Sequence, residues 1–173
     1  KLNTIYHIPY TIQYTGIDNS EELLKQAKKL HKDHNLKSKI YNLKFQHGDM
    51  LTIPFPDNHF NQIWCIAAFH HLPKEYQLQG AKEISRVMRK DSLLIITAWN
   101  LWQFRYWKEI FKAFLRNPLR IQNLFIPWKK GEKKVDRFYY AFTQNEFKKI
   151  FKSAIKLLNE DCPKDSCEWC EGR

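Results

Sequence analysis

The apolar residues of this chain fall into two patterns, short continuous runs and helical spacings. Four runs of strand length are rich in Ile, Leu and aromatic residues: 12–18, 43–47, 60–68 and 92–99. Between the runs, apolar residues recur every three or four positions, at Leu23, Leu24, Ala27 and Leu30 and again at Leu78, Ala81, Ile84, Val87 and Met88. Because this spacing places them on one face of a helix, the predicted order is strand, helix, strand, loop, strand, helix, strand.

This alternation predicts an α/β fold with a Rossmann-like, doubly wound and mostly parallel sheet. The run 60–68 is apolar almost throughout, as expected for a strand that is buried on both faces of a parallel sheet. Ser20 is a favourable N-cap for the first helix. Thr143 and Glu146 have the spacing of a capping box, so a further helix is predicted to begin at this point.

The pattern changes after Asn100. Residues 101–115 are expected to form an aromatic-rich helix, and 117–134 a basic segment interrupted by prolines. We interpret 101–140 as a substrate-side insertion or lid within a single domain that spans 1–173. A chain of 173 residues is long enough for one α/β core and too short for two.

The chain is strongly basic, with 29 Lys and Arg against 18 Asp and Glu and a net charge of +11. Such a charge favours polyanionic partners, because neutralising phosphates releases counterions. It is equally typical of a plain lysine-rich surface. The basic run after Trp128 has the same two interpretations, a phosphate-binding segment or a solvated loop: Lys129, Lys130, Lys133 and Lys134.

The sequence predicts no membrane segment, because no run approaches the roughly 18 consecutive apolar residues of a bilayer span. The first ten residues lack the layout of a secretory signal, so we expect a cytoplasmic protein. Three of the four cysteines, Cys162, Cys167 and Cys170, are spaced C-x4-C-x2-C. Zinc usually takes four ligands, so we interpret them as reduced thiols and predict no metal site.

Two acidic residues follow predicted strands, and ligands of a doubly wound sheet bind at the carboxyl ends of its strands. Asp18 ends the first run, where its carboxylate suits the two hydroxyls of a ribose or, alternatively, caps the helix that begins near Ser20. Asp49 follows the second run, where it suits an adenine amino group while Met50 packs on the ring. The alternative for Asp49 is an ordinary Gly-Asp turn.

The third strand ends in Ala67 and Ala68, which leave room for a ligand, and is followed by His70 and His71. A histidine pair suits a general base or a metal ligand. Adjacent residues point in different directions, and no set of acidic residues completes a metal site. One of two such histidines is more often structural, and the sequence does not favour zinc here.

Taken together, "YTGIDNSEELLKQAKK", "FQHGDMLTIPFPDNHFNQIWCIAAFHHL" and "EISRVMRKDSLLIITAW" resemble successive motifs of class I S-adenosylmethionine-dependent methyltransferases over residues 14–99. The resemblance implies S-adenosylmethionine as the cofactor. It implies as binding residues Gly16, Asp18, Asn19, Asp49, Met50, Ala67 and Ala68. The glycine loop of that family has no counterpart, because the five glycines never form G-x-G. We expect the family's first and last strands to lie outside this sequence.

A finer resemblance concerns "AAFHHL", "KVDRFYYAFTQNEFKKIF" and the Trp-rich insertion, which are similar to the tRNA wobble-uridine carboxymethyl methyltransferases. It implies methyl transfer to the carboxylate of 5-carboxymethyluridine in a tRNA anticodon, with tRNA and a small activator subunit as partners. An ionised carboxylate needs alignment more than a strong base. The candidate residues for holding it are His70, His71, Arg137 and Tyr139. The alternative for Arg137 is a surface ion pair, which is common for an arginine beside an aromatic strand.

Two other functions are compatible with the same motifs. A small-molecule methyltransferase of the quinone or sterol type shares the core motifs and predicts an apolar pocket from 101–127. A non-catalytic relative that binds RNA or a partner protein is the second, because no glycine loop is present in these residues.

Overall fold

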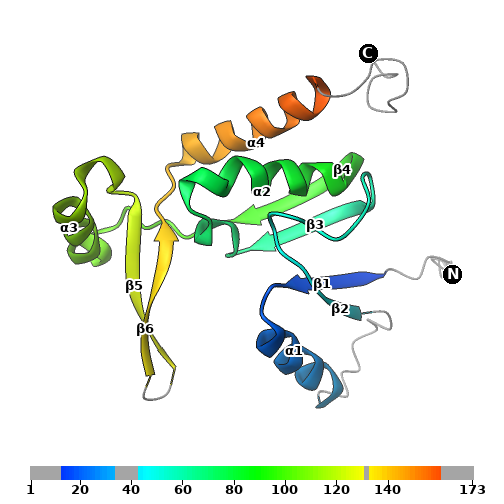
Figure 1. The fold of residues 1–173 in the computed structure, drawn as a ribbon, viewed down its shortest axis with the longest axis horizontal. Coiled ribbons are helices and arrows are strands. Elements are labelled where there is room, and N and C mark those ends of the chain that lie inside the picture. The colour runs from blue at the N-terminus through cyan, green and yellow to red at the C-terminus, as the bar shows by residue number, and fades with distance from the viewer. Residues whose placement is uncertain (1–12, 34–42, 131–132, 161–173) are drawn as a thin grey trace, which may run out of the picture. The chain divides into compact units, whose positions relative to one another are not determined.

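The chain divides into two compact units, Lys1–Met50 and Leu51–Arg173. The computed structural model describes residues 13–33, 43–130 and 133–160 (Figure 1). Among these residues the strands form three two-stranded sheets, one in the first unit and two in the second.

The first unit contains β1 (Tyr14–Asp18), α1 (Glu21–Asp33) and β2 (Leu43–His47). The two strands are parallel, and Asp18 is opposite His47 at their carboxyl ends. Ser20 begins the helix as predicted, because its Oγ accepts a hydrogen bond from the Leu23 N–H at 3.3 Å.

The core of the second unit is a second parallel pair, β3 (Phe60–Ile66) and β4 (Met88–Thr97), joined by the 3-10 turn η1 (Phe69–His71) and α2 (Lys74–Val87). α4 (Gln144–Glu160) packs against α2, and both helices lie on the same side of the strand pair (Figure 1). Phe69 is fully buried, with its ring 5.1 to 5.9 Å from those of Phe142, Phe147 and Phe151. The predicted α/β class with parallel strands is therefore confirmed.

Side-chain hydrogen bonds hold the loop before β3 and the start of α4. All five N–H groups of Arg86 donate at 2.8 to 2.9 Å, to both carboxylate oxygens of Glu83, to Asp57 and to the backbone carbonyls of Ile53 and Phe55. These bonds lower the pKa of Glu83, although burial alone would raise it. At α4, the predicted capping box is present. The Thr143 N–H donates to Glu146 Oε2 at 3.0 Å, and the Glu146 N–H donates to Thr143 Oγ1 at 3.3 Å.

The segment after β4 differs from its prediction. The expected helix over 101–115 is shorter, because a 3-10 turn η2 (Phe104–Tyr106) precedes α3 (Trp107–Arg116). The basic segment is not an irregular loop. After the 3-10 turn η3 (Pro118–Arg120), it forms β5 (Asn123–Lys130), which pairs antiparallel with β6 (Lys133–Tyr140).

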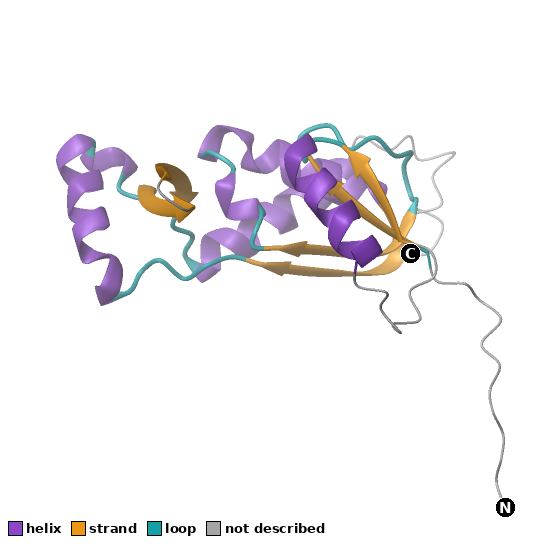
Figure 2. Ribbon diagram, turned by 90° about the horizontal axis from the view of Figure 1, so that it is seen from below, coloured by secondary structure: helices purple, strands orange, loops and turns teal. Residues whose placement is uncertain are grey.

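The strand pairing is stabilised by packing that residue propensity does not reveal. Leu101, Ala113, Leu124, Tyr139 and Ala141 form one buried cluster that joins α3 to the hairpin. The hairpin lies beside α3 in both views (Figures 1 and 2). Proline at position 127 is accommodated because β5 has a strand partner on one side among the described residues.

Two strand boundaries also differ from the prediction. Met88 begins β4 instead of ending the helix, because it is opposite Phe60. The His59 N–H donates to the Val87 carbonyl at 2.9 Å just before this pair. β3 ends at Ile66, two residues early, because Ala67 has a φ of 51°. Among the described residues, no helix combines the length and apolar character that crossing a bilayer requires.

Candidate functional site

Most of the predicted site residues lie at or just after the carboxyl ends of two parallel strand pairs, one in each unit, whereas Gly16 lies within β1 and Arg137 and Tyr139 lie on β6 of the hairpin. Gly16, Asp18, Asn19, Asp49 and Met50 belong to the first unit. Ala67, Ala68 and the predicted catalytic residues belong to the second.

Asp18 is held at the junction between β1 and α1. Its Oδ1 accepts a hydrogen bond from the Ser20 N–H at 2.7 Å, and its backbone carbonyl accepts one from the Gly48 N–H at 3.1 Å. The structural interpretation of Asp18 as a local cap is thus confirmed. It does not exclude ligand binding, because a carboxylate offers about four acceptor sites and the helix entrance uses one.

Residues near Asp18 complete the carboxyl-terminal edge of the β1–β2 strand pair. The register brings Asp18 opposite His47, so Asp49 follows at the same edge of the strand pair. The Asn19 carbonyl lies 3.1 Å from His47 Nε2, which ties the two strand ends together. Gly16 has a packing role, since a Cβ there would meet Phe45 Cδ1 at 3.1 Å. Two carboxylates at one strand edge, with half-buried Met50 beside them, match the hydroxyl and amino donors of an adenosine.

In the second unit, Ala67 redirects the chain at the end of β3. Its φ of 51° lies in the left-handed region, which costs a non-glycine residue about 1–2 kcal/mol. The Ala67 N–H donates to both the carbonyl and the Oγ1 of Thr97, at 3.2 and 3.0 Å. Ala68 then begins η1, which carries both histidines. Such local strain recurs at functional sites.

His70 is a buried neutral donor. Its ring is 1% exposed, and its Nδ1 lies 3.2 Å from the backbone N–H of Trp99, which can only donate. Nδ1 must therefore accept, so the proton of the neutral ring is on Nε2. Burial, followed by the neighbouring charge of His71, lowers the pKa of His70 to about 4. Within the described part of the chain, the buried Nε2 has no hydrogen-bond partner.

His71 has the opposite tautomer. Its Nδ1 lies 2.8 Å from the carbonyl oxygen of Phe138, which can only accept. Nδ1 therefore donates, and the neutral ring keeps a lone pair on Nε2. His71 is exposed, whereas His70 is buried. Two rings whose centroids are 4.6 Å apart thus provide one N–H donor and one basic nitrogen.

Tyr139 and Trp99 add aromatic rings to this pair. Tyr139 is buried, and its ring centroid lies 5.2 Å from that of His70 and 4.6 Å from that of His71. Trp99 stacks on Tyr139 at 5.4 Å and is 41% exposed. We call His70, His71, Trp99 and Tyr139 the histidine cluster. The sequence interpretation missed Trp99 as a site residue, although its place just after β4 was the available signal.

Arg137 is a predicted catalytic residue that lies outside the histidine cluster, where its side chain contacts Trp128. Its guanidinium carbon lies 4.6 Å above the ring centroid of Trp128. Its side chain is exposed, whereas Tyr139, two residues later on β6, is buried in the histidine cluster. The structure therefore brings together three of the four predicted catalytic residues.

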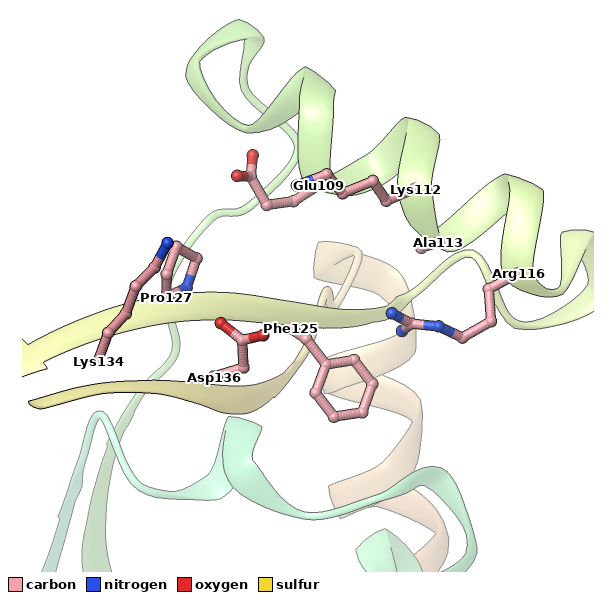
Figure 3. Close-up of a pocket in the computed structure, with 8 residues that line it drawn as sticks. All are labelled: Glu109, Lys112, Ala113, Arg116, Phe125, Pro127, Lys134 and Asp136. Atoms are coloured by element: carbon pink, nitrogen blue, oxygen red, sulfur yellow. The ribbon is translucent and has the colours of Figure 1, made fainter.

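A separate pocket of about 140 Å³ lies between α3 and the hairpin (Figure 3). Its lining carries both signs of charge, with Lys112, Arg116 and Lys134 against Glu109 and Asp136. Lys134 comes from the predicted basic run. The other three lysines of that run end β5 or begin β6, where Lys129 is opposite Lys134 and Lys130 is opposite Lys133. The run is thus largely the end of a hairpin.

Among residues 13–33, 43–130 and 133–160, no group of three or more His, Cys, Asp or Glu side chains is arranged to hold a metal ion. Cys65 is buried in β3, and burial raises the pKa of its thiol. Cys162, Cys167 and Cys170 lie outside the described residues.

A protein-family model described as "Methyltransferase domain" matches residues 3–96, more than half of the chain. Among curated proteins, the chain is similar to the demethylmenaquinone methyltransferase of Listeria welshimeri. The two are 29% identical over 102 residues, which is 59% of this chain and 41% of that protein. The match therefore spans less than half the length of such curated relatives.

Solved structures show the same fold. A SAM-dependent methyltransferase of Methanosarcina mazei superposes with a TM-score of 0.67 at 19% identity, covering 81% of this chain and 67% of that chain. A SAM-dependent methyltransferase of Thermotoga maritima gives a TM-score of 0.52 at 18% identity, covering 82% and 53%. The family and these neighbours imply S-adenosylmethionine as the cofactor.

Proposed function

We propose, since the chain belongs to the family of methyltransferase domains, that it transfers a methyl group from S-adenosylmethionine to a hydroxylated aromatic small molecule of the quinol type. The observation that carries this proposal is the pair of opposite histidine tautomers beside two aromatic rings. The similarity to the Listeria demethylmenaquinone methyltransferase supports the same class of acceptor.

The cofactor supplies an electrophilic methyl group when it is bound. In this proposal Asp18 accepts hydrogen bonds from the ribose hydroxyls and Asp49 accepts one from the adenine amino group. Met50 would pack on the purine. In the second unit, the small side chains of Ala67 and Ala68 leave room beside the end of β3. The chemistry of this donor and acceptor set fits adenosine, since carboxylates at strand ends are acceptors only.

His71 is the proposed general base. A phenolic hydroxyl becomes a good nucleophile only when it loses its proton, and the Nε2 lone pair of His71 can accept that proton. The Phe138 carbonyl then stabilises the imidazolium, because the Nδ1–H bond at 2.8 Å persists in both protonation states. The proton passes to solvent afterwards, since His71 is exposed.

His70 is the proposed donor to a second substrate oxygen. Because its pKa is about 4, it stays neutral near pH 7 and keeps its Nε2–H. A neutral donor stabilises developing negative charge on oxygen without itself competing for the proton. Trp99, which is 41% exposed, provides a flat apolar surface on which an aromatic ring can stack, and buried Tyr139 supports it from behind.

The experiment measures transfer of labelled methyl groups from S-adenosylmethionine to a soluble naphthoquinol. His71→Gln and His71→Ala should both lose activity by about 100-fold or more, because neither side chain can take up a proton. His59→Gln is the matched control, because His59 precedes β3, at the opposite end of that strand, and stacks on Phe55. Full activity in His71→Gln would refute the base.

A second candidate is methyl transfer to the carboxylate of 5-carboxymethyluridine in a tRNA anticodon. The net charge of +11 and the lysines at the hairpin end favour it. A carboxylate is already ionised, so this acceptor needs hydrogen-bond donors and no base. His71→Gln should then retain far more activity than His71→Ala, and Arg137→Ala should impair both kcat and KM.

Salt dependence separates the two candidates. Binding to tRNA should weaken linearly on a plot of log affinity against log salt, because each neutralised phosphate releases counterions. A filter-binding series across ionic strength measures this slope. A flat response, together with turnover of the naphthoquinol, would assign the chain to the small-molecule class. Turnover of neither acceptor, with tRNA binding intact, would favour a non-catalytic RNA-binding relative.

A further inference from the structure

The surface of η2, α3 and η3 carries large apolar side chains that point away from the core. Phe104 is 87% exposed, Leu115 67% and Leu119 92%. Around them lie three more aromatic side chains that are about half exposed: Trp107, Phe111 and Phe114. We call these six residues the α3 face. Single exposed apolar residues are ordinary, but six within one short segment are the kind of patch that marks an interaction surface.

The α3 face is not needed for core packing, because α3 has a second apolar face that packs inward. Ala113 is buried in the cluster with Leu101 and Leu124, and Ile110 packs against the same cluster. On an adjoining side of the helix, Trp107, Phe111, Phe114 and Leu115 have the spacings i, i+4, i+7 and i+8 of one helix face. The helix is therefore anchored by one face while the other is exposed.

Cations flank the exposed stripe. Between Phe104 and Arg116 the sequence has four Lys and Arg residues against a single carboxylate, Glu109, whereas Arg120 forms an ion pair with Glu75 at 3.1 Å. On α3 the cations recur at every fourth position, namely Lys108, Lys112 and Arg116. The Arg116 guanidinium lies 4.8 Å from the ring centroid of Phe125, toward which it extends in Figure 3. An aromatic and aliphatic stripe thus runs beside a row of positive charge.

We propose that the α3 face docks on the surface of an anionic lipid bilayer, with α3 lying in the plane of the interface. Trp and Phe prefer the boundary between headgroups and acyl chains, while Lys and Arg stems extend toward anionic headgroups. α3 has ten residues, which is too short to span a bilayer and is enough for an interfacial element. This inference does not depend on the identity of the methyl acceptor.

The side chains favour lipid over RNA or protein. RNA bases stack on aromatic rings, but Leu115 and Leu119 have no ring face and gain nothing from stacking. Acyl chains can bury both the aromatic and the aliphatic side chains, and burying apolar surface away from water is favourable for both kinds. A second copy of this chain would bring like charges together around the patch. An anionic membrane matches the apolar and the cationic parts at once.

Vesicle flotation of the full chain tests the proposal. Vesicles of phosphatidylcholine mixed with phosphatidylglycerol should carry the protein to the top of the gradient, and vesicles of phosphatidylcholine alone should carry at least tenfold less. The variant Phe104→Ser/Leu119→Ser should lose at least tenfold of the binding, because both side chains are almost fully exposed and contribute little to the core. Lys108→Gln/Lys112→Gln should weaken binding to the anionic vesicles alone.

Ile155→Ser is the matched control, because Ile155 is a half-exposed aliphatic residue on α4. It should float like the wild type, and circular dichroism should show that all variants are folded. Absence of flotation with either vesicle, or unchanged flotation of Phe104→Ser/Leu119→Ser, would overturn the proposal. Loss of oligonucleotide binding or of a sedimenting dimer in that variant, without vesicle binding, would assign the face to RNA or to a second copy. Vesicle binding is measured without S-adenosylmethionine or a methyl acceptor, so failure here is distinct from failure of the methyl-transfer proposal.

Discussion

Acidification should destabilise this protein through His70. The native pKa is about 4, whereas an unfolded histidine titrates near about 6.5. Between these two pH values, His70 is protonated in the unfolded chain and neutral in the native state. The stabilisation by neutral His70 is therefore complete above the unfolded pKa and decreases as the pH falls toward the native value.

The structure explains both the sign and the size of the effect. His70 is 1% exposed, so a charge there loses its hydration, and the positive charge of His71 adds repulsion. A proton on Nδ1 would also face the Trp99 N–H, which is 3.2 Å away. A native pKa of about 4 against an unfolded value of about 6.5 corresponds to a full difference of about 3.5 kcal/mol. About 3 kcal/mol of this is lost between pH 7 and pH 4, because the native ring is itself half protonated at pH 4.

Urea unfolding at a series of pH values measures this loss. His70→Asn is the informative variant, because its amide oxygen can still accept the Trp99 N–H while the side chain does not titrate. The wild type should lose about 3 kcal/mol more than this variant over the range. Parallel curves for wild type and His70→Asn would refute the reasoning. A nitrogen-detected titration of His70 with a midpoint above 6 would refute it independently.

Three further predictions concern packing and the cofactor. Arg86→Lys should lower the free energy of unfolding by about 1–3 kcal/mol, since one ammonium cannot replace five hydrogen bonds. Arg89→Lys is the control, because it loses one exposed hydrogen bond and should change the free energy of unfolding by less than about 0.5 kcal/mol. Equal effects of the two substitutions would contradict this. Thr143→Ala should reduce stability in thermal melts by about 1 kcal/mol through loss of the α4 cap, and an unchanged Tm would mean that the cap contributes nothing. Asp18→Ala should weaken S-adenosylmethionine binding by about 1–3 kcal/mol in calorimetry, and unchanged affinity with an intact fold would remove Asp18 from the site.

The fold of the two parallel strand pairs could be predicted from the sequence because the relevant signals are local. Apolar periodicity acts within four residues in a helix and two in a strand, and each helix cap joins residues two to four positions apart. Ser20 and Thr143 therefore cap the helices that were expected. The α3 segment and the hairpin were predicted less well. Pairing of Asn123 with Tyr140 spans 17 positions, and strand formation there depends on packing against Leu101 and Ala113.

The candidate site divides in the same way. The sequence alone identified His70 and His71 as chemically notable, since two histidines after a buried strand lie where ligands of such sheets bind. Only the tertiary structure decided which nitrogen of each ring carries the proton. The deciding groups are the backbone N–H of Trp99 and the backbone carbonyl of Phe138, 29 and 67 residues away along the chain. Every residue other than proline carries the same N–H and C=O, so no residue pattern can reveal which of them meets a given ring.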